Sequence, residues 1–238
     1  MSEQSHYSIV CPHCEAELDV ELYDSINVVE APSLRDELMQ NQLNAVECPH
    51  CGFRFRVDKQ LLYHDPERRV MIYWFPGNEQ GYQQHRAEFL RSMEAISTVL
   101  PDEFDPPTVH LVFTRSELVE RIFMLEEELS ERVIEYIKYM MYTRNLEKLD
   151  PRRVAILFNA EDSNDRALCF VTQDLETMEL EGVLEYDRSA YEGLLEMFDQ
   201  DDQREQLLQL FPGPYVSARA MLIQDEEREA GGSAGPGA

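Results

Sequence analysis

Hydrophobic and polar positions form the same short pattern twice within the first 64 residues. Residues 15–22 alternate acidic and apolar side chains without interruption, so the apolar ones share one face of a predicted strand. Residues 53–57 alternate in the same way, with Arg54 and Arg56 in the polar positions. If the two strands pair, acids lie opposite arginines, and each pair contributes roughly a few tenths of a kcal/mol. The charges of this segment would then support a sheet.

The pattern between and after these strands predicts a helix and an internal strand. Ser33 is positioned to cap a short helix, because Asp36 follows three residues later. Leu34 and Leu38 give this helix one apolar side. Residues 69–75 are apolar on both faces, which is typical of a strand inside a sheet.

The second half of the chain alternates predicted strands with capped helices. A helix is expected over residues 82–100, and the prolines at 101, 106 and 107 end it and provide a linker. Thr114 and Glu117 form a capping box after a strand over residues 109–113. Further helices are expected to begin at Ser130 and at Ser189, which is followed by Glu192. The other predicted strands cover residues 154–158, 168–172, 180–186 and 215–223, and an acidic loop over 159–166 joins the first two.

Four of the five cysteines lie in two Cys-Pro-His-Cys motifs, one before each alternating strand. Two residues between paired cysteines let both sulfurs reach one ion from a tight turn, and two such turns complete a tetrahedron with Zn–S distances of about 2.3 Å. Cys11, Cys14, Cys48 and Cys51 are therefore the predicted ligands of one structural Zn²⁺ ion. A closed shell of four sulfurs has no open position for water or substrate, so we expect no catalysis at this metal.

Other interpretations of the two motifs fit their setting less well. A redox Cys-x-x-Cys pair normally opens a helix, whereas both pairs here lead into strands. His13 and His50 lie inside the turns, but four thiolates already complete the shell, so we interpret both as exposed. Iron bound by the same four sulfurs is a chemically possible alternative to zinc. Gly52 follows the second motif where Glu15 follows the first, which predicts more backbone strain in the first turn.

The order of motifs resembles the CpXC domain family of prokaryotes over about the first half of the chain, to about Ser130. The resemblance rests on both Cys-Pro-His-Cys motifs and on the segments 24–28, 43–44 and 61–65 at their spacing. It implies a zinc-ribbon-like fold with the four cysteines as ligands, and it brings no catalytic residues. The second half of the chain resembles no family in this way.

These patterns together predict an α+β fold. We expect a zinc-ribbon-like four-cysteine domain over residues 1–66, then a strand, a helix and a linker over 67–108. An α+β domain of antiparallel strands and amphipathic helices is expected over 109–224. The charged and then Gly- and Ala-rich residues 225–238 are expected to form a disordered tail.

Composition and charge limit the classes of function. With 43% hydrophobic and 29% charged residues, the chain is expected to be globular and not fibrous or disordered. Its net charge of −26 repels phosphate backbones and attracts basic partners, although a surface adapted for solubility or salt is the alternative explanation. No apolar run approaches the roughly 20 residues that cross a bilayer, and the start is polar. We therefore expect a cytoplasmic protein without a membrane span, and leave its oligomeric state open.

Three hypotheses of function follow. The leading one is a non-catalytic zinc protein that acts as an interaction module for a protein partner, which the charge suggests is basic. The first alternative is nucleic-acid binding by the basic and aromatic stretch from Arg54 to Arg69, which Asp58, Asp65 and Glu67 oppose. The second is an enzyme with a site in the C-terminal half, although the chain has no phosphate loop, nucleophile elbow or metalloprotease helix. We assign no catalytic residue.

Three further features have ordinary structural interpretations. Cys169 lies in an apolar run and is expected to be a buried thiol. His64 and Asp65 precede Pro66, and we interpret them as turn residues, not as an acid/base pair. The acidic loop at 161–165 lacks the glycine and distal glutamate of a calcium loop.

Overall fold

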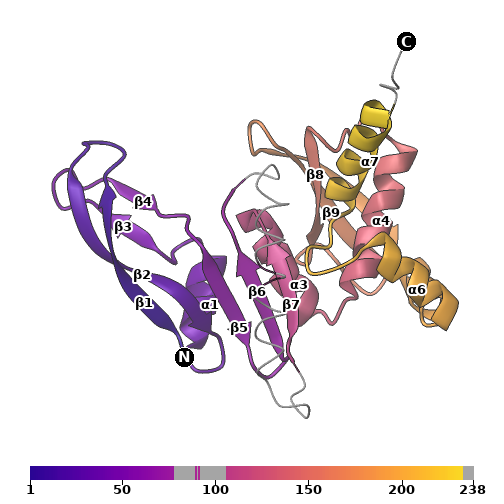
Figure 1. Ribbon diagram of the computed structural model, residues 1–238, viewed down its shortest axis with the longest axis horizontal. Coiled ribbons are helices and arrows are strands. Elements are labelled where there is room, and N and C mark those ends of the chain that lie inside the picture. Colours follow the sequence, from indigo (N-terminus) through magenta and orange to yellow (C-terminus); the bar gives the residue numbers. More distant parts are fainter. Residues whose placement is uncertain (78–88, 90, 92–105, 233–238) are drawn as a thin grey trace. The chain divides into compact units, whose positions relative to one another are not determined.

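The computed structural model describes residues 1–77, 89, 91 and 106–232. The chain divides into two compact units, Met1–Leu118 and Val119–Ala238 (Figure 1). Both combine sheets with helices, so the predicted α+β class is confirmed. The finer subdivision at residues 66 and 108 stays a prediction. No helix in the described part of the chain is long and apolar enough to cross a membrane.

A five-stranded mixed sheet forms the centre of the first unit. Its strands are β1 (Glu3–Val10), β2 (Glu17–Asn27), β5 (Leu61–Asp65), β6 (Val70–Trp74) and β7 (Thr108–Val112), in the order β1-β2-β5-β6-β7. The pairs β1–β2 and β5–β6 are antiparallel, whereas β2–β5 and β6–β7 are parallel. β6 lies inside the sheet, as the apolar pattern of residues 69–75 predicts, and its Ile72 is fully buried.

Three smaller elements complete the described part of this unit: α1 (Pro32–Met39), β3 (Ala45–Glu47) and β4 (Arg54–Arg56). The helix α1 buries Leu34 and Leu38 as expected. The predicted cap at Ser33 is wrong, because the N-cap is Ala31, two residues earlier, and the helix begins at Pro32. Proline suits the first helical position, since its fixed φ is already helical and its missing N–H is not needed there.

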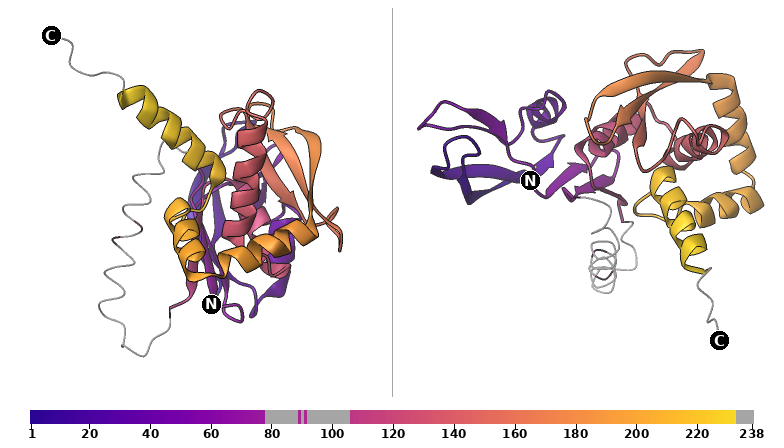
Figure 2. Two further views of the ribbon diagram at one scale, coloured as in Figure 1. Left: turned by 90° about the vertical axis from the view of Figure 1, so that its right-hand side faces the viewer. Right: turned by 90° about the horizontal axis from the view of Figure 1, so that it is seen from above.

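The two alternating strands do not pair with each other, so the charge pairs considered for that case do not form. β2 pairs with β1 and β5, whereas β4 pairs with β3 in a separate two-stranded sheet. The acid opposite Arg54 is therefore Glu47 of β3, whose carboxylate lies 3.1 Å from the guanidinium. β1, which the polar start of the chain does not indicate, takes the place beside β2 (Figures 1 and 2). The predicted helix over residues 82–100 lies outside the described residues, apart from Phe89 and Arg91.

An antiparallel sheet and five helices make up the described part of the second unit, with α3 beginning at the end of the first. The sheet has the order β10-β9-β8, and the predicted strands over residues 154–158, 168–172 and 180–186 are confirmed. The elements are α3 (Arg115–Glu126), α4 (Glu131–Arg144), β8 (Val154–Asn159), β9 (Ala167–Asp174), β10 (Leu180–Asp187), α5 (Arg188–Phe198), α6 (Asp201–Leu210) and α7 (Ala218–Gly232).

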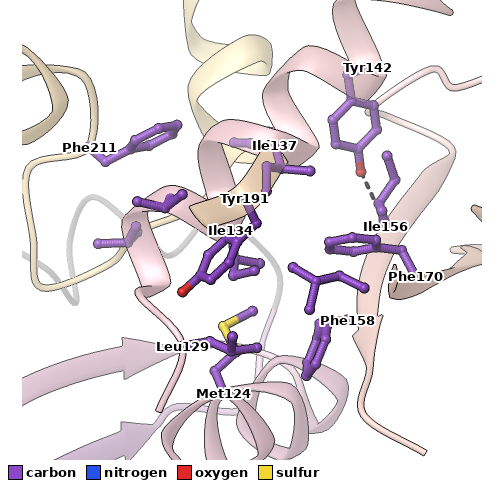
Figure 3. Packing of buried hydrophobic residues seen from close by; sticks show 14 of the residues in the cluster. Met124, Leu129, Ile134, Ile137, Tyr142, Ile156, Phe158, Phe170, Tyr191 and Phe211 are labelled. Atoms are coloured by element: carbon purple, nitrogen blue, oxygen red, sulfur yellow. Dashed lines mark hydrogen bonds between the residues drawn. The ribbon is translucent and has the colours of Figure 1, made fainter. Parts of the chain in front are cut away.

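The core of the second unit lies between α4 and this sheet (Figure 3). Ile134 and Ile137 of α4 belong to the same buried cluster as Phe158 of β8 and Phe170 of β9. The Tyr142 hydroxyl accepts a hydrogen bond from the Ile156 N–H at 3.0 Å and donates one to the Val154 carbonyl at 2.9 Å. Apolar packing and these two bonds together hold the end of α4 on β8.

The helix starts confirm one predicted cap and correct another. The Thr114 hydroxyl accepts from the Glu117 N–H at 3.1 Å, and the Glu117 carboxylate accepts from the Thr114 N–H at 3.1 Å, which completes the predicted capping box. At α5 the cap is Asp187 and not Ser189, because the Asp187 carboxylate accepts from the Ala190 N–H. Ionised carboxylates are strong acceptors at this position.

The last predicted strand, over residues 215–223, is wrong, because α7 begins at Ala218. The Ser217 hydroxyl accepts from the Ala220 N–H at 3.2 Å, as in a helix cap. Alanine, methionine, leucine and arginine in the first turns all favour a helix. The helix continues to Gly232, through eight residues that the composition predicts to be disordered.

Candidate metal centre

Two tight turns of closely similar backbone geometry carry the four cysteines. The N–H of Cys11 donates to the Ala16 carbonyl at 2.9 Å, and the N–H of Cys48 donates to the Phe53 carbonyl at 2.9 Å. In each turn the residue after the second cysteine also donates back to the carbonyl of the first, at 2.9 Å and 2.8 Å. The internal repeat seen in the sequence is therefore a structural repeat as well.

Both turns need a left-handed residue directly after the second cysteine. Gly52 has φ +72° in the second turn, and Glu15 has φ +59° in the first. A residue with a Cβ atom rarely adopts this conformation, whereas glycine does so readily. The expected strain in the first turn is thus located at Glu15.

The turns bring all four cysteine sulfurs together. Their Sγ atoms lie within 4.8 Å of one another, with Cys11 and Cys51 separated by 3.8 Å and Cys14 and Cys48 by 3.6 Å. These separations are close to the edge of about 3.8 Å of a tetrahedron whose centre lies about 2.3 Å from each sulfur. They are far from the roughly 2.05 Å of a disulfide, and all four thiols are free. The arrangement can hold one metal ion.

Each turn contributes one buried and one exposed sulfur ligand. Cys11 and Cys48 are 0% and 1% exposed, whereas Cys14 and Cys51 are exposed. The buried pair packs with Leu18 of β2. Partly buried apolar side chains surround these three residues, namely Ile9, Val20, Val46 and Phe55. An apolar shell of this kind limits the access of water to the inner half of the site.

Full ionisation of the four sulfurs would require a cation. Burial raises the pKa of Cys11, but hydrogen bonds from the N–H groups of Cys14 and His13 outweigh it and lower that pKa to about 7. The Phe53 N–H lowers the pKa of Cys51, but burial and the neighbouring sulfurs raise it to about 12. Four thiolates at this spacing repel one another, so all four are ionised together only when a metal ion neutralises them.

The histidines of the two turns are separate from the sulfur cluster. Among the described residues, the group of side chains that can hold a metal contains the four cysteines and neither His13 nor His50. The His13 ring instead stacks on Phe53 at 5.2 Å, and Phe53 stacks on Phe55 at 6.2 Å. Phe53 is 41% exposed, so this ring stack forms an aromatic surface beside the sulfurs. Sequence reasoning missed it, although Phe53 lies two residues after Cys51.

The basic stretch predicted as an alternative binding site is largely paired with acids. Arg54 pairs with Glu47, and the other ion pairs in this stretch are Arg56 with Asp58 at 2.6 Å, Lys59 with Asp24, and Arg68 with Asp65 at 2.9 Å. These pairs leave little net positive charge for phosphate groups.

The remaining predicted features keep their ordinary roles. Cys169 is buried, its thiol donates to the Asp162 carbonyl at 3.1 Å, and burial raises its pKa. His64 and Asp65 are the last two residues of β5 and not turn residues as expected. Asp65 is buried and accepts from Arg68, whereas His64 lies on the opposite face of the strand. Residues 161–165 form the loop of the β8–β9 hairpin.

A surface hollow of about 400 Å³ in the second unit bears on the enzyme alternative. Arg152 in its wall pairs with Glu226 at 2.6 Å. The Asp174 carboxylate accepts from the N–H groups of Thr177 and Glu176, which together lower its pKa. Arg152 and Asp174 of the hollow are thus already bound to other groups of the chain. This geometry does not lead us to assign a catalytic residue there.

Comparison with known proteins adds one finding to this geometry. A family model described as CpXC protein matches residues 9–138. The chain belongs to the CpXC family. The match includes all four cysteines and ends inside α4, so the CpXC region extends slightly beyond the limit near Ser130 that the motifs suggest. No curated protein and no solved structure matches the chain.

Proposed function

We propose that this CpXC protein is a non-catalytic interaction module, held together at its N-terminal end by one zinc ion on Cys11, Cys14, Cys48 and Cys51. The observation that carries the metal assignment is the set of four sulfurs at tetrahedral spacing. Two turns that close on one ion, each leading into a thin strand pair, make this part of the protein zinc-ribbon-like. A shell completed by four thiolates leaves no position for a substrate, which supports a structural role.

The exposed ring stack beside the metal supports the interaction role. Phe53 is 41% exposed, and Val10 at the base of the first turn is 57% exposed. Two large apolar side chains next to a rigid metal site offer a partner a surface that loses little entropy on binding. The neighbouring arginines pair with acids, so the partner best suited to this surface is a protein and not a nucleic acid.

The metal is tested by elemental analysis of protein purified without added zinc. We expect about one zinc per chain, because four thiolates form a complete tetrahedral site. Protein without any metal and with its cysteines in disulfides would overturn the assignment. Iron in place of zinc would leave the structural role intact and correct the identity of the ion.

The interaction surface is tested with a matched pair of variants. A tagged full-length protein with Phe53→Asp should lose a partner that the wild type retains in a pull-down read by mass spectrometry. Val29→Asp is the control, because Val29 is equally exposed at 42% but lies away from the two turns. If Phe53→Asp keeps every partner, this surface does not make the contact.

The nucleic-acid alternative is tested on the same protein. Wild type should not retard single- or double-stranded oligonucleotides at physiological salt, because its net charge is −26. A shift at low micromolar concentration that disappears in an Arg54→Ala, Arg56→Ala variant would instead favour nucleic-acid binding.

A further inference from the structure

The sheet of the second unit has an outer face that its helices do not cover. On the inner face, Leu184 of β10 lies opposite Phe170 of β9, and both belong to or pack against the buried core. On the outer face, Val183 lies opposite Val171, which lies opposite Leu157 of β8. The helices α4 and α5 lie on the inner side, and no described helix of the unit lies on the outer side (Figure 2). Three apolar side chains therefore form a row across this outer face.

A β-bulge extends the row along β10. Leu180 lies opposite Gln173 and Gly182 opposite Thr172, so the register shifts by one residue between them. Because of this extra residue, Leu180 points to the same face as Val183 although it is three positions away. Three of the nine exposed large hydrophobic side chains among the described residues fall within six positions here, namely Met178 (54%), Leu180 (64%) and Val183 (61%).

β10 is also an edge strand, and all of its charged side chains are acidic. In the order β10-β9-β8 it has one described neighbour, so every second N–H and C=O group along its other side faces outward. The strand and the residue before it carry four exposed acids and no base, namely Glu179, Glu181, Glu185 and Asp187. A second copy of the chain would place acids opposite acids, which destabilises a strand pair. A basic strand would instead place opposite charges near these four acids.

The hairpin that presents this edge is held rigidly. The Asp174 carboxylate accepts hydrogen bonds from the Glu176 and Thr177 N–H groups at 2.8 Å each. The Gln173 side chain donates to the Met178 carbonyl at 3.0 Å. A partner strand therefore meets an edge that is already in its binding conformation, which lowers the entropic cost of adding a strand.

We propose that the free edge of β10 binds an extended, basic segment of a partner protein as a fourth strand of this sheet. Main-chain hydrogen bonds to β10 supply the affinity, apolar side chains of the segment cover Leu180 and Val183, and its lysines or arginines meet the four acids. The surface lies in the second unit and uses no residue of the four-cysteine site. It shares no residue with the Phe53 surface, so an experiment can contradict one proposal and leave the other unaffected.

The probe is a synthetic peptide of alternating lysine and valine, as long as β10 at eight residues. It is added to the zinc-loaded, full-length protein, and binding is followed by fluorescence anisotropy and by hydrogen–deuterium exchange. We expect the peptide to bind and to slow exchange at the amides of β10. A peptide of the same composition with its lysines and valines in two blocks is the control for non-specific attraction to an acidic protein, and it should bind at least tenfold more weakly.

Two variants test separately the apolar outer face of the sheet and the acidic charge of β10. Val183→Lys should weaken binding of the alternating peptide by about tenfold, because it removes the apolar contact and repels the lysines. Leu208→Lys is the matched control, since Leu208 is an exposed apolar residue of α6 and should not change the affinity. In Glu181→Lys, Glu185→Lys the preference should reverse, toward a peptide of alternating glutamate and valine.

Three outcomes would overturn the inference: no binding, equal binding of the block and alternating peptides, or exchange protection elsewhere than β10. Protection confined to residues 11–14 and 48–53 would move the contact to the metal-side surface, against this inference and in agreement with the proposed function. Protection of β10 together with reversed preference in the double variant is the result that supports strand addition.

Discussion

Lys138 lies at the centre of three buried charges in the second unit. Its ammonium group contacts the Glu120 carboxylate at 2.5 Å and the Glu135 carboxylate at 2.7 Å, and all three side chains are almost fully buried. Glu120 also accepts from the Phe158 N–H, and Glu135 from the Ala218 N–H at 2.8 Å. Burial raises the pKa of Glu120 although Lys138 opposes this shift. These side chains thus join α3, α4, β8 and the start of α7.

Lys138→Met should lower the free energy of unfolding of the second unit by about 3–5 kcal/mol, because it leaves two buried carboxylates without their cation. Urea unfolding followed by circular dichroism measures this loss. Lys148→Met, at an exposed lysine, is the control and should stay within about 0.5 kcal/mol of wild type. Equal effects of both substitutions would mean that the three charges contribute no more than a surface site.

The left-handed residues after the two motifs give a reciprocal pair of substitutions. Glu15→Gly should raise the free energy of unfolding of the first unit by about 1 kcal/mol, because it relieves a φ of +59°. Gly52→Ala should lower it by about the same amount, since no atom lies near the added Cβ and only the backbone conformation opposes it. Denaturant midpoints of the zinc-loaded proteins test both signs, and a shift in the same direction for both variants would contradict the argument.

At the scale of elements, an ion pair connects three segments of the first unit. Asp24 of β2 pairs with Lys59, accepts from the Tyr7 hydroxyl of β1 at 2.5 Å, and Lys59 lies 4.6 Å from the Tyr7 ring centre. Burial raises the pKa of Asp24, but hydrogen bonds from Lys59, Ser5 and Tyr7 and the charge of Lys59 outweigh it and lower the pKa to about 2. A depressed folded-state pKa stabilises the fold above the unfolded value and loses this effect in acid.

The pH dependence of stability should report this pair. Between wild type and Asp24→Asn, the difference in free energy of unfolding should be constant from neutral pH to about pH 4, and then shrink as pH falls towards 2. Any metal ion on the four cysteines would leave both proteins in the same acid range, so this contribution cancels in the difference. Urea unfolding at a series of pH values tests it, and a difference that grows in acid would have the wrong sign.

Local patterns in the sequence predict strands better than they predict which strands meet. Alternation identifies the segment that becomes β2, and two-sided apolarity identifies β6 as internal. Neither pattern shows that Arg54 lies opposite Glu47 of β3 and not opposite an acid of β2. Which strands become neighbours depends on how the connecting segments place them, and alternation within one strand does not contain this information. The gathering of the four cysteines was predictable from the two motifs, because four sulfurs at this spacing have one favourable geometry around an ion. The burial of the Lys138 charge was not predictable from the sequence, since a charged residue in a helix is normally exposed.

At the scale of the whole molecule, the cysteine end of the first unit has a much smaller apolar core than the second unit. Among the described residues, the second unit has a large buried apolar cluster, whereas the buried cluster at the four cysteines consists of Cys11, Leu18 and Cys48. Structural zinc contributes on the order of 10 kcal/mol in small peptides, more than any single side chain here can supply. The stability of the part of the first unit around the four cysteines should therefore depend on a bound metal ion far more than the stability of the second unit does.

Removal of the metal should divide the chain by its sensitivity to protease. Cys48→Ser, or a strong chelator, should expose residues 8–63 to cleavage, while a fragment covering about residues 119–224 stays resistant in the same digest. Mass spectrometry of the fragments identifies the boundary. If both halves resist cleavage without metal, the ion does not stabilise the fold, and a regulatory or redox role of the cysteines becomes the better explanation.

For the zinc ion that we propose, the burial of the four cysteines sets the route by which it leaves. Each turn places its first cysteine inside and its second outside, so an approaching chelator or oxidant meets Cys14 and Cys51 and is kept from Cys11 and Cys48. Because each turn has one of the outer sulfurs, loss of both still leaves each turn attached to the ion through its inner cysteine. We therefore expect the proposed zinc ion to exchange stepwise through the exposed half of the site, with both turns held in place until the last two bonds break.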